Sequence, residues 1–113
     1  MTTDRAADTL TRLFDVRNTR VVVTGAASGL GFAMAEVLAD CGAHVTLADI
    51  DAARLDASVT RLADRGAHVR GVVADVRDEG AVDALFDGIV AAEGGVDVVF
   101  ANAGLASVPG FRV

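Results

Sequence analysis

Apolar residues along the chain follow two patterns that alternate. Short runs rich in β-branched residues predict strands at 21–24, 44–48, 68–73 and 96–101. Stretches in which apolar residues recur every three or four positions predict helices after the glycines at 25–31, at 51–65 and at 78–93. The predicted order is therefore strand, helix, strand, helix, strand, helix, strand.

The helix after the first strand has a clear apolar face. Its apolar residues recur at helical spacing, in the set Leu30, Met34, Val37, Leu38 and Cys41. Gly42 provides a natural stop for this helix. We expect the helix to pack through that face, with Cys41 buried as a small apolar residue. As the single cysteine, Cys41 allows no disulfide within the chain.

Strands that alternate with helices of this length pair in parallel through right-handed crossovers. Apolar runs without alternation, such as VVV at 21–23 and VDVVFA at 96–101, fit strands that helices cover on both faces. The predicted fold is an α/β domain of the Rossmann type over residues 14–113, with an open parallel sheet in the order 3-2-1-4. Residues 1–13 carry apolar residues at helical spacing and predict a helical extension.

Composition and charge narrow the class of protein. The chain has 113 residues, of which 52% are hydrophobic, enough for one domain with a core. Its net charge of -6 is spread without a basic block, so nucleic acid is not expected as a partner. Residues 1–12 carry no apolar leader, and no apolar run approaches the roughly 20 residues of a membrane span. We therefore expect a soluble, cytoplasmic protein without a membrane partner.

Three glycines lie in the turn after the first strand, in the segment TGAASGLG at 24–31. In such a sheet this turn lies where the strand order reverses, and the free N–H groups of the following helix attract an anion. We expect Gly25 to make the turn, Gly29 to let a pyrophosphate approach the backbone, and Gly31 to let the helix pack on the strand. Ser28 adds a hydroxyl donor.

The spacing of this turn is T-G-x-x-x-G-x-G. It differs from the fingerprint G-x-G-x-x-G, because Met34 stands where a third glycine would follow Gly29 and Gly31. A P-loop is excluded, since no Gly-Lys-Ser/Thr follows. An S-adenosylmethionine site is an alternative, because methyltransferases also use a glycine-rich first turn. Their loops favour an acid before the glycines, whereas Val23-Thr24 stand there in this chain.

The T-G-x-x-x-G-x-G spacing resembles the cofactor loop of the short-chain dehydrogenase/reductase family. Three further segments at the ends of predicted strands are similar to that family, namely Asp49-Ile50, Asp75-Val76 and Asn102-Ala103-Gly104, with Ala101 in place of the family's first Asn. The resemblance extends from Phe14 to about Leu105, which is nearly the whole chain.

The resemblance implies an NAD site. The Asp49 carboxylate would accept hydrogen bonds from the adenosine ribose and repel the 2′-phosphate of NADP, whereas Asp51 is interpreted as a helix cap. Asp75-Val76 would contact adenine, Asn102 would hold the central sheet, and the backbone of Ala103-Gly104 would pass the cofactor ribose. The predicted cofactor-binding residues are Gly25, Ser28, Gly29, Leu30, Gly31, Asp49, Ile50, Asp75, Val76, Asn102, Ala103 and Gly104.

Family members transfer hydride between nicotinamide and a carbonyl or alcohol, with a Y-x-x-x-K pair and a Ser beyond the fourth strand. This sequence contains no Tyr, and all of its 10 basic residues are Arg, so these residues cannot form that pair. His44 and His68 open predicted strands at the opposite end of the sheet and are interpreted as surface residues. We predict no catalytic residue and no metal ligand in this chain.

Two functions therefore stay open. The chain is the NAD(H)-binding portion of an oxidoreductase acting on a small alcohol or carbonyl substrate, truncated or completed by another chain, or it is a non-catalytic nucleotide-binding or regulatory module. In the order 3-2-1-4 the strand at 96–101 would be left at an edge with unpaired backbone groups. This predicts association with a second copy or with a complementing chain.

Overall fold

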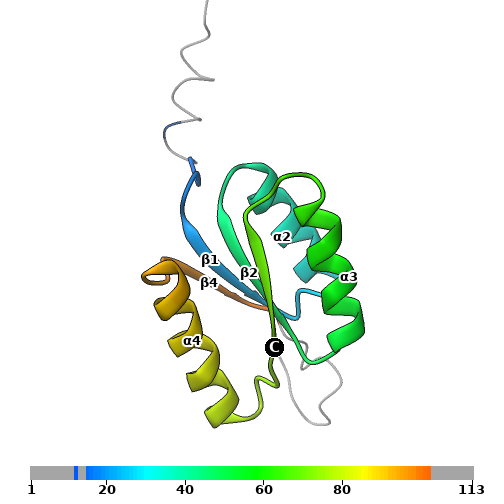
Figure 1. The fold of residues 1–113 in the computed structure, drawn as a ribbon, viewed down its shortest axis with the longest axis vertical. Helices are drawn as coiled ribbons and strands as arrows, with labels where there is room; N and C mark the ends of the chain where they lie inside the picture. The colour runs from blue at the N-terminus through cyan, green and yellow to red at the C-terminus, as the bar shows by residue number, and fades with distance from the viewer. Residues whose placement is uncertain (1–11, 13–14, 103–113) are drawn as a thin grey trace, which may run out of the picture.

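A computed structural model of the chain describes residue 12 and residues 15–102 (Figure 1). Within this part strands and helices alternate as predicted, in the order β1 (Arg20–Thr24), α2 (Gly29–Asp40), β2 (His44–Asp49), α3 (Ala52–Ala63), β3 (Val69–Val73), α4 (Glu79–Glu93) and β4 (Val98–Ala101). The helical extension expected at 1–13 lies outside the described residues except for Arg12. None of the described helices has the length and apolar character needed to cross a bilayer.

The four strands form one sheet in the order β3-β2-β1-β4. All three pairings are parallel, and Val22 in the middle of β1 pairs with Thr46 of β2 on one side and Val99 of β4 on the other. This confirms the predicted α/β fold and strand order. Because the strands are parallel, all four carboxyl ends lie at one edge of the sheet.

Helices cover the two faces of the sheet. Figure 1 shows α2 and α3 on one face and α4 on the other. Successive residues of a strand point to opposite faces, so Val21 and Val23 pack in a core with α2 and α3, while Val22 packs with Leu85 and Ile89 of α4. The prediction that residues 21–23 are covered on both faces is confirmed.

Local signals set the ends of the helices. Asp51 precedes α3, and its carboxylate accepts a hydrogen bond from the Arg54 N–H at 3.1 Å, which confirms its predicted role as a cap. Asp78 caps α4 in the same way through the Gly80 N–H at 2.9 Å. Gly94 ends α4 with a φ of +85°, a left-handed conformation that favours glycine.

The buried face of α2 consists of its smallest residues. Gly31, Ala35 and Ala39 are buried against the sheet, whereas Leu30 is 67% exposed and Val37 is 62% exposed. The predicted apolar face is therefore correct only in part: Leu38 packs against the core, whereas Leu30 and Val37 do not. Small side chains let a helix approach the sheet closely, and the larger residues are then turned to the flank of the helix.

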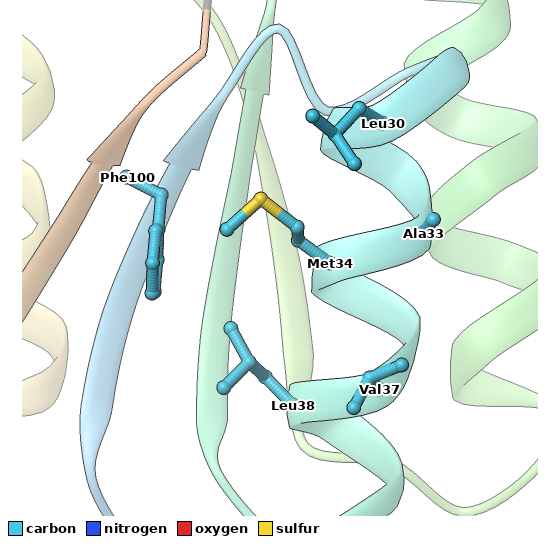
Figure 2. Close-up of a pocket in the computed structure, with 6 residues that line it drawn as sticks. All are labelled: Leu30, Ala33, Met34, Val37, Leu38 and Phe100. Carbon is cyan, nitrogen blue, oxygen red and sulfur yellow. The ribbon is translucent and has the colours of Figure 1, made fainter.

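That flank forms an open apolar groove of about 370 Å³ against β4, lined by Leu30, Ala33, Met34, Val37, Leu38 and Phe100. Figure 2 shows Met34 and Leu38 pointing from α2 toward Phe100 on β4. Val98 and Val99 of β4 are also exposed. The prediction that residues 96–101 are covered on both faces was wrong for the described part of the chain, because β4 is an edge strand.

Cys41 is exposed, so the prediction that it is buried was wrong. The helix ends at Asp40, and Cys41 is the C-cap residue, with φ -86° and ψ 5°. The periodicity of α2 no longer determines the direction of its side chain there. Gly42 follows with a φ of +91°, in agreement with its predicted role as the stop.

Candidate functional site

The predicted site residues come from four different strand ends. Gly25 follows β1, Asp49 is the last residue of β2, Asp75 lies just beyond β3, and Asn102 follows β4. The parallel sheet therefore brings these positions to the same edge, and the strand order reverses between β1 and β4. Ala103 and Gly104 lie outside the described residues.

The glycines of the turn have distinct geometric roles. Gly25 and Gly29 have φ values of +65° and +59°, in the left-handed region that other residues rarely adopt. A Cβ built on Gly31 would lie 2.8 Å from the carbonyl carbon of Gly25 and closer still to its oxygen, so α2 packs on the turn only with glycine there. A Cβ built on Gly29 would meet nothing within 4 Å. The turn is therefore closely packed at Gly31 and open at Gly29.

The amino end of α2 faces this open side. Ser28 is the N-cap residue in an extended conformation, and its hydroxyl makes no capping hydrogen bond. The first N–H groups of a helix have no acceptor within the helix, and the helix dipole makes this end positive. The first turn of α2 contains no acidic residue. These features suit an anion held by backbone N–H groups and the Ser28 hydroxyl.

Asp49 links the end of β2 to the glycine turn. Its Oδ2 accepts a hydrogen bond from the Ala27 N–H at 3.0 Å, and its Oδ1 accepts one from the Asp51 N–H at 2.9 Å. A carboxylate has about four acceptor positions, so each oxygen can accept a further hydrogen bond. Ile50, next to it, is largely exposed. Sequence reasoning missed the contact to Ala27, because a backbone donor leaves no signal in the residue type.

Two more hydrogen bonds fix the same turn. The Ala26 N–H donates to the Ala48 carbonyl oxygen at 3.2 Å, and the Ser58 hydroxyl of α3 donates to the Ala27 carbonyl oxygen at 3.3 Å. Ser58 is buried, and a polar residue on the apolar face of a predicted helix was the signal that could have found it. The turn is thus held by hydrogen bonds to β2 and α3.

Asn102 and Thr24 join the end of β4 to that of β1. The Asn102 N–H donates to the Thr24 hydroxyl oxygen at 3.0 Å, and this hydroxyl donates to the Phe100 carbonyl oxygen at 3.4 Å. The Asn102 amide also lies against Gly31, where a Cβ would come within 2.7 Å of its Nδ2. Thr24 had been assigned no role, although its position directly before Gly25 was a usable signal.

The carboxylate of Asp75 is engaged locally. It accepts hydrogen bonds at 3.0 Å from the N–H, Nε and Nη2 of Arg77. These bonds lower the pKa of Asp75 and raise that of Arg77. Val76, between them, is half-buried. Arg77 was not assigned a role from the sequence, and it holds Asp75 as an ionised acceptor.

The two histidines lie at the opposite edge. His44 begins β2 and His68 directly precedes β3, as expected from the sequence. Their rings stack, with centroids 3.7 Å apart, and both approach Glu93. They are therefore far from the glycine turn along their strands and play no part in this site.

A comparison with known protein families agrees with the features of this site, namely the glycine turn, the acid at the end of β2 and the Asn after β4. The family model described as short chain dehydrogenase matches residues 19–112. The chain belongs to the short-chain dehydrogenase/reductase family. This confirms the resemblance found in the sequence.

Curated members of the short-chain dehydrogenase/reductase family are similar to the chain in this same region. It is 49% identical over 84 residues to 1-deoxy-11-beta-hydroxypentalenate dehydrogenase of Streptomyces avermitilis, a match that covers 74% of this chain and 31% of that protein. It is 42% identical over 86 residues to D-threitol dehydrogenase of Mycolicibacterium smegmatis, covering 75% of this chain and 33% of the relative. The chain thus spans about a third of the length of these relatives.

Solved structures of the family share the fold. A short-chain dehydrogenase/reductase from Burkholderia phymatum in complex with NAD aligns with a TM-score of 0.74 and 40% identity, over 76% of this chain and 31% of that protein. A short-chain dehydrogenase from Mycobacterium smegmatis aligns with a TM-score of 0.72 and 37% identity, over 75% of this chain and 36% of that protein.

Proposed function

We propose that the chain is the cofactor-binding portion of a dehydrogenase that uses NAD(H) to interconvert an alcohol and a carbonyl. The observation that carries this proposal is the position of the Asp49 carboxylate, which is bonded to the Ala27 N–H inside the glycine turn. An acceptor with free capacity at this place suits the two ribose hydroxyls of an adenosine, and its charge opposes a 2′-phosphate.

The described residues fit a dinucleotide along the carboxyl edge of the sheet. Residues 25–31 and the amino end of α2 would hold the pyrophosphate, in the open space beside Gly29. Asp49 would bind the adenosine ribose, with Asp75 and Val76 beside the adenine. The bound nicotinamide would supply the site that accepts or donates hydride. The NAD-bound relative from Burkholderia phymatum supports this assignment.

The proton transfer of such a reaction needs an acid or base that these 113 residues do not supply as a Tyr or Lys. We propose that it comes from a catalytic segment beyond these residues, in the same polypeptide or in a complementing chain. The lack of Tyr and Lys also favours a second candidate, a nucleotide-binding module without catalysis.

The test is a titration of the purified chain with NADH, followed by the fluorescence of the cofactor. We expect Gly29→Asp to weaken binding by about tenfold or more, because a carboxylate would meet the pyrophosphate. Gly66→Asp is a matched control, since Gly66 also has a positive φ, +83°, and open space around it, but follows α3. Equal affinities for the Gly29 and Gly66 variants would contradict the proposal, as would the absence of NADH binding to the parent chain.

A further inference from the structure

Three potential metal ligands meet at the edge of the sheet opposite the glycine turn. His44 is the first residue of β2, His68 directly precedes β3, and Glu93 is the last residue of α4. The register pairs Val45 with Val69, and the Val45 N–H donates to the His68 carbonyl oxygen at 3.0 Å. This parallel register places the two histidines side by side, and the end of α4 brings Glu93 to them.

The donor atoms have separations suited to one ion. Glu93 Oε1 lies 3.5 Å from His44 Nδ1 and 3.1 Å from His68 Nε2, and one ligand atom from each residue lies within 4.8 Å of the others. In a tetrahedral zinc site with bonds of about 2.0–2.1 Å, neighbouring ligand atoms lie about 3.4 Å apart. The 3.5 Å separation matches this value, and the 3.1 Å separation, which is a hydrogen bond in this structure, is close to it.

The surrounding charges favour a cation. Glu93 stands at the carboxyl end of α4, where the helix dipole is negative, and the last turn of α4 contains no basic residue. The Glu93 side chain is only 14% exposed. Arg20 interacts electrostatically with Glu93, but its Nε and Nη2 are each hydrogen-bonded to Asp97 at 3.0 Å. The nearest partners of the Glu93 carboxylate are therefore the imidazoles of His44 and His68.

One divalent ion can bind both rings and the carboxylate. The imidazole planes are 10° apart with ring centroids at 3.7 Å. A metal ion binds neutral imidazoles and the carboxylate together. The rings must turn out of the stack to direct their nitrogens at one ion, and both side chains are partly exposed, which leaves room for that rotation.

We propose that His44, His68 and Glu93 form a site for a divalent transition-metal ion of the zinc class. Two imidazoles and one carboxylate are ligands typical of Zn²⁺, Co²⁺ and Ni²⁺, whereas Mg²⁺ prefers oxygen ligands. Three protein ligands leave a fourth position for water or another donor. The bound ion would tie the amino ends of β2 and β3 to the end of α4, away from the cofactor site.

The experiment is a calorimetric titration of the untagged chain with Zn²⁺. All variants carry Cys41→Ser, because the exposed Cys41 thiol is itself a zinc ligand. We expect one Zn²⁺ per chain. The variants His44→Ala, His68→Ala and Glu93→Gln should each bind Zn²⁺ roughly tenfold more weakly or worse, because removing a residue that only hydrogen-bonds to a metal ligand already costs about that much affinity. Glu36→Gln is the control, because Glu36 is paired with Arg65 elsewhere and its loss leaves zinc binding unchanged.

Two further readings make the outcome decisive. Circular dichroism of each variant shows whether it has kept the fold, and the melting temperature should rise with Zn²⁺ in the Cys41→Ser parent but not in the His44→Ala, His68→Ala double variant. Mg²⁺ should give no signal at the same concentrations. The proposal is overturned if the parent binds no Zn²⁺, or if folded variants without the two histidines bind it equally well.

Discussion

Replacing Gly31 with Ala tests how closely α2 packs on the glycine turn. The new Cβ would lie 2.8 Å from the carbonyl carbon of Gly25 and 2.7 Å from the Nδ2 of Asn102. The nearest obstacle is the Gly25 carbonyl group, which is backbone and not the end of a flexible side chain. The substitution must therefore displace the start of α2 from the sheet.

Two opposing effects set the size of the change. Ala is favoured over Gly inside a helix by about 1 kcal/mol, and overpacking a close contact costs about 1–3 kcal/mol, or more. Because the clash involves backbone and a hydrogen-bonded strand end, we expect the clash to exceed the helix gain and to lower the free energy of unfolding by about 2 kcal/mol. In a domain of this size that lowers the melting temperature by roughly 8 °C.

Gly88→Ala provides the matched control within α4. A Cβ built on Gly88 meets nothing within 4 Å, so only the helix preference remains, and we expect a gain of about 0.5–1 kcal/mol. Thermal and urea unfolding of the two variants and the parent, followed by circular dichroism, measures both effects. If Gly31→Ala is as stable as the parent while Gly88→Ala behaves as expected, the close packing of α2 on the turn is refuted.

Four other expectations can be checked on the same protein. Asp49→Asn should weaken NADH binding and narrow the preference for NADH over NADPH, and tighter NADPH binding by the unchanged chain would refute the role of Asp49. The purified chain should not oxidise alcohols with NAD above background, because the rate enhancement of roughly 10² to 10⁴ from a positioned acid or base is missing. Turnover that Gly29→Asp abolishes would show a catalytic group that we have not identified. Hydrogen bonds from Arg20 lower the pKa of Asp97 to about 2, so the stabilisation from this pair is complete above the ordinary value of 3.8 and is lost as the pH falls toward 2. Asp97→Asn should thus flatten the pH dependence of the melting temperature over that range. An unchanged pH profile would count against a stabilising role of the Arg20–Asp97 pair. The exposed β4 and the apolar flank of α2 should make the chain self-associate in sedimentation experiments until a complementing chain is supplied, whereas a stable monomer would show that this surface is protected.

The features that the sequence predicted correctly depend on local signals. The alternation of apolar periods predicted the elements, and Asp51 before an apolar helical stretch predicted a cap. The handedness of the crossovers predicted the parallel pairing, and the strand order was taken from the doubly wound fold that this alternation indicates. Because parallel strands end at one edge, the same reasoning placed Gly25, Asp49 and Asn102 together before their contacts were known.

The features that were missed depend on tertiary packing. The apolar pattern of α2 contains a large face with Leu30 and Val37 and a small face with Ala35 and Ala39, and periodicity does not say which one meets the sheet. The face that meets the sheet is determined by the close packing of α2 on the turn after β1. Only glycine at position 31 permits this close packing.

Contacts made by backbone groups and by strand register were also beyond the sequence pattern. The bond from the Ala27 N–H to Asp49 involves a donor that every residue type except proline carries. The proximity of His44 and His68 depends on the register of β2 with β3, which the sequence alone did not fix. Two histidines that open neighbouring strands were nevertheless a signal that could have been used.

The proposed function is tested most directly by mapping where NADH binds, with the amide signals of the ¹⁵N-labelled chain followed by NMR during a titration. We expect the signals of residues 25–31, Asp49 and Ile50 to move and to saturate together, while those of His44 and His68 stay in place. Saturable shifts confined to another surface, or none at all, would contradict a dinucleotide site at the carboxyl edge of this sheet.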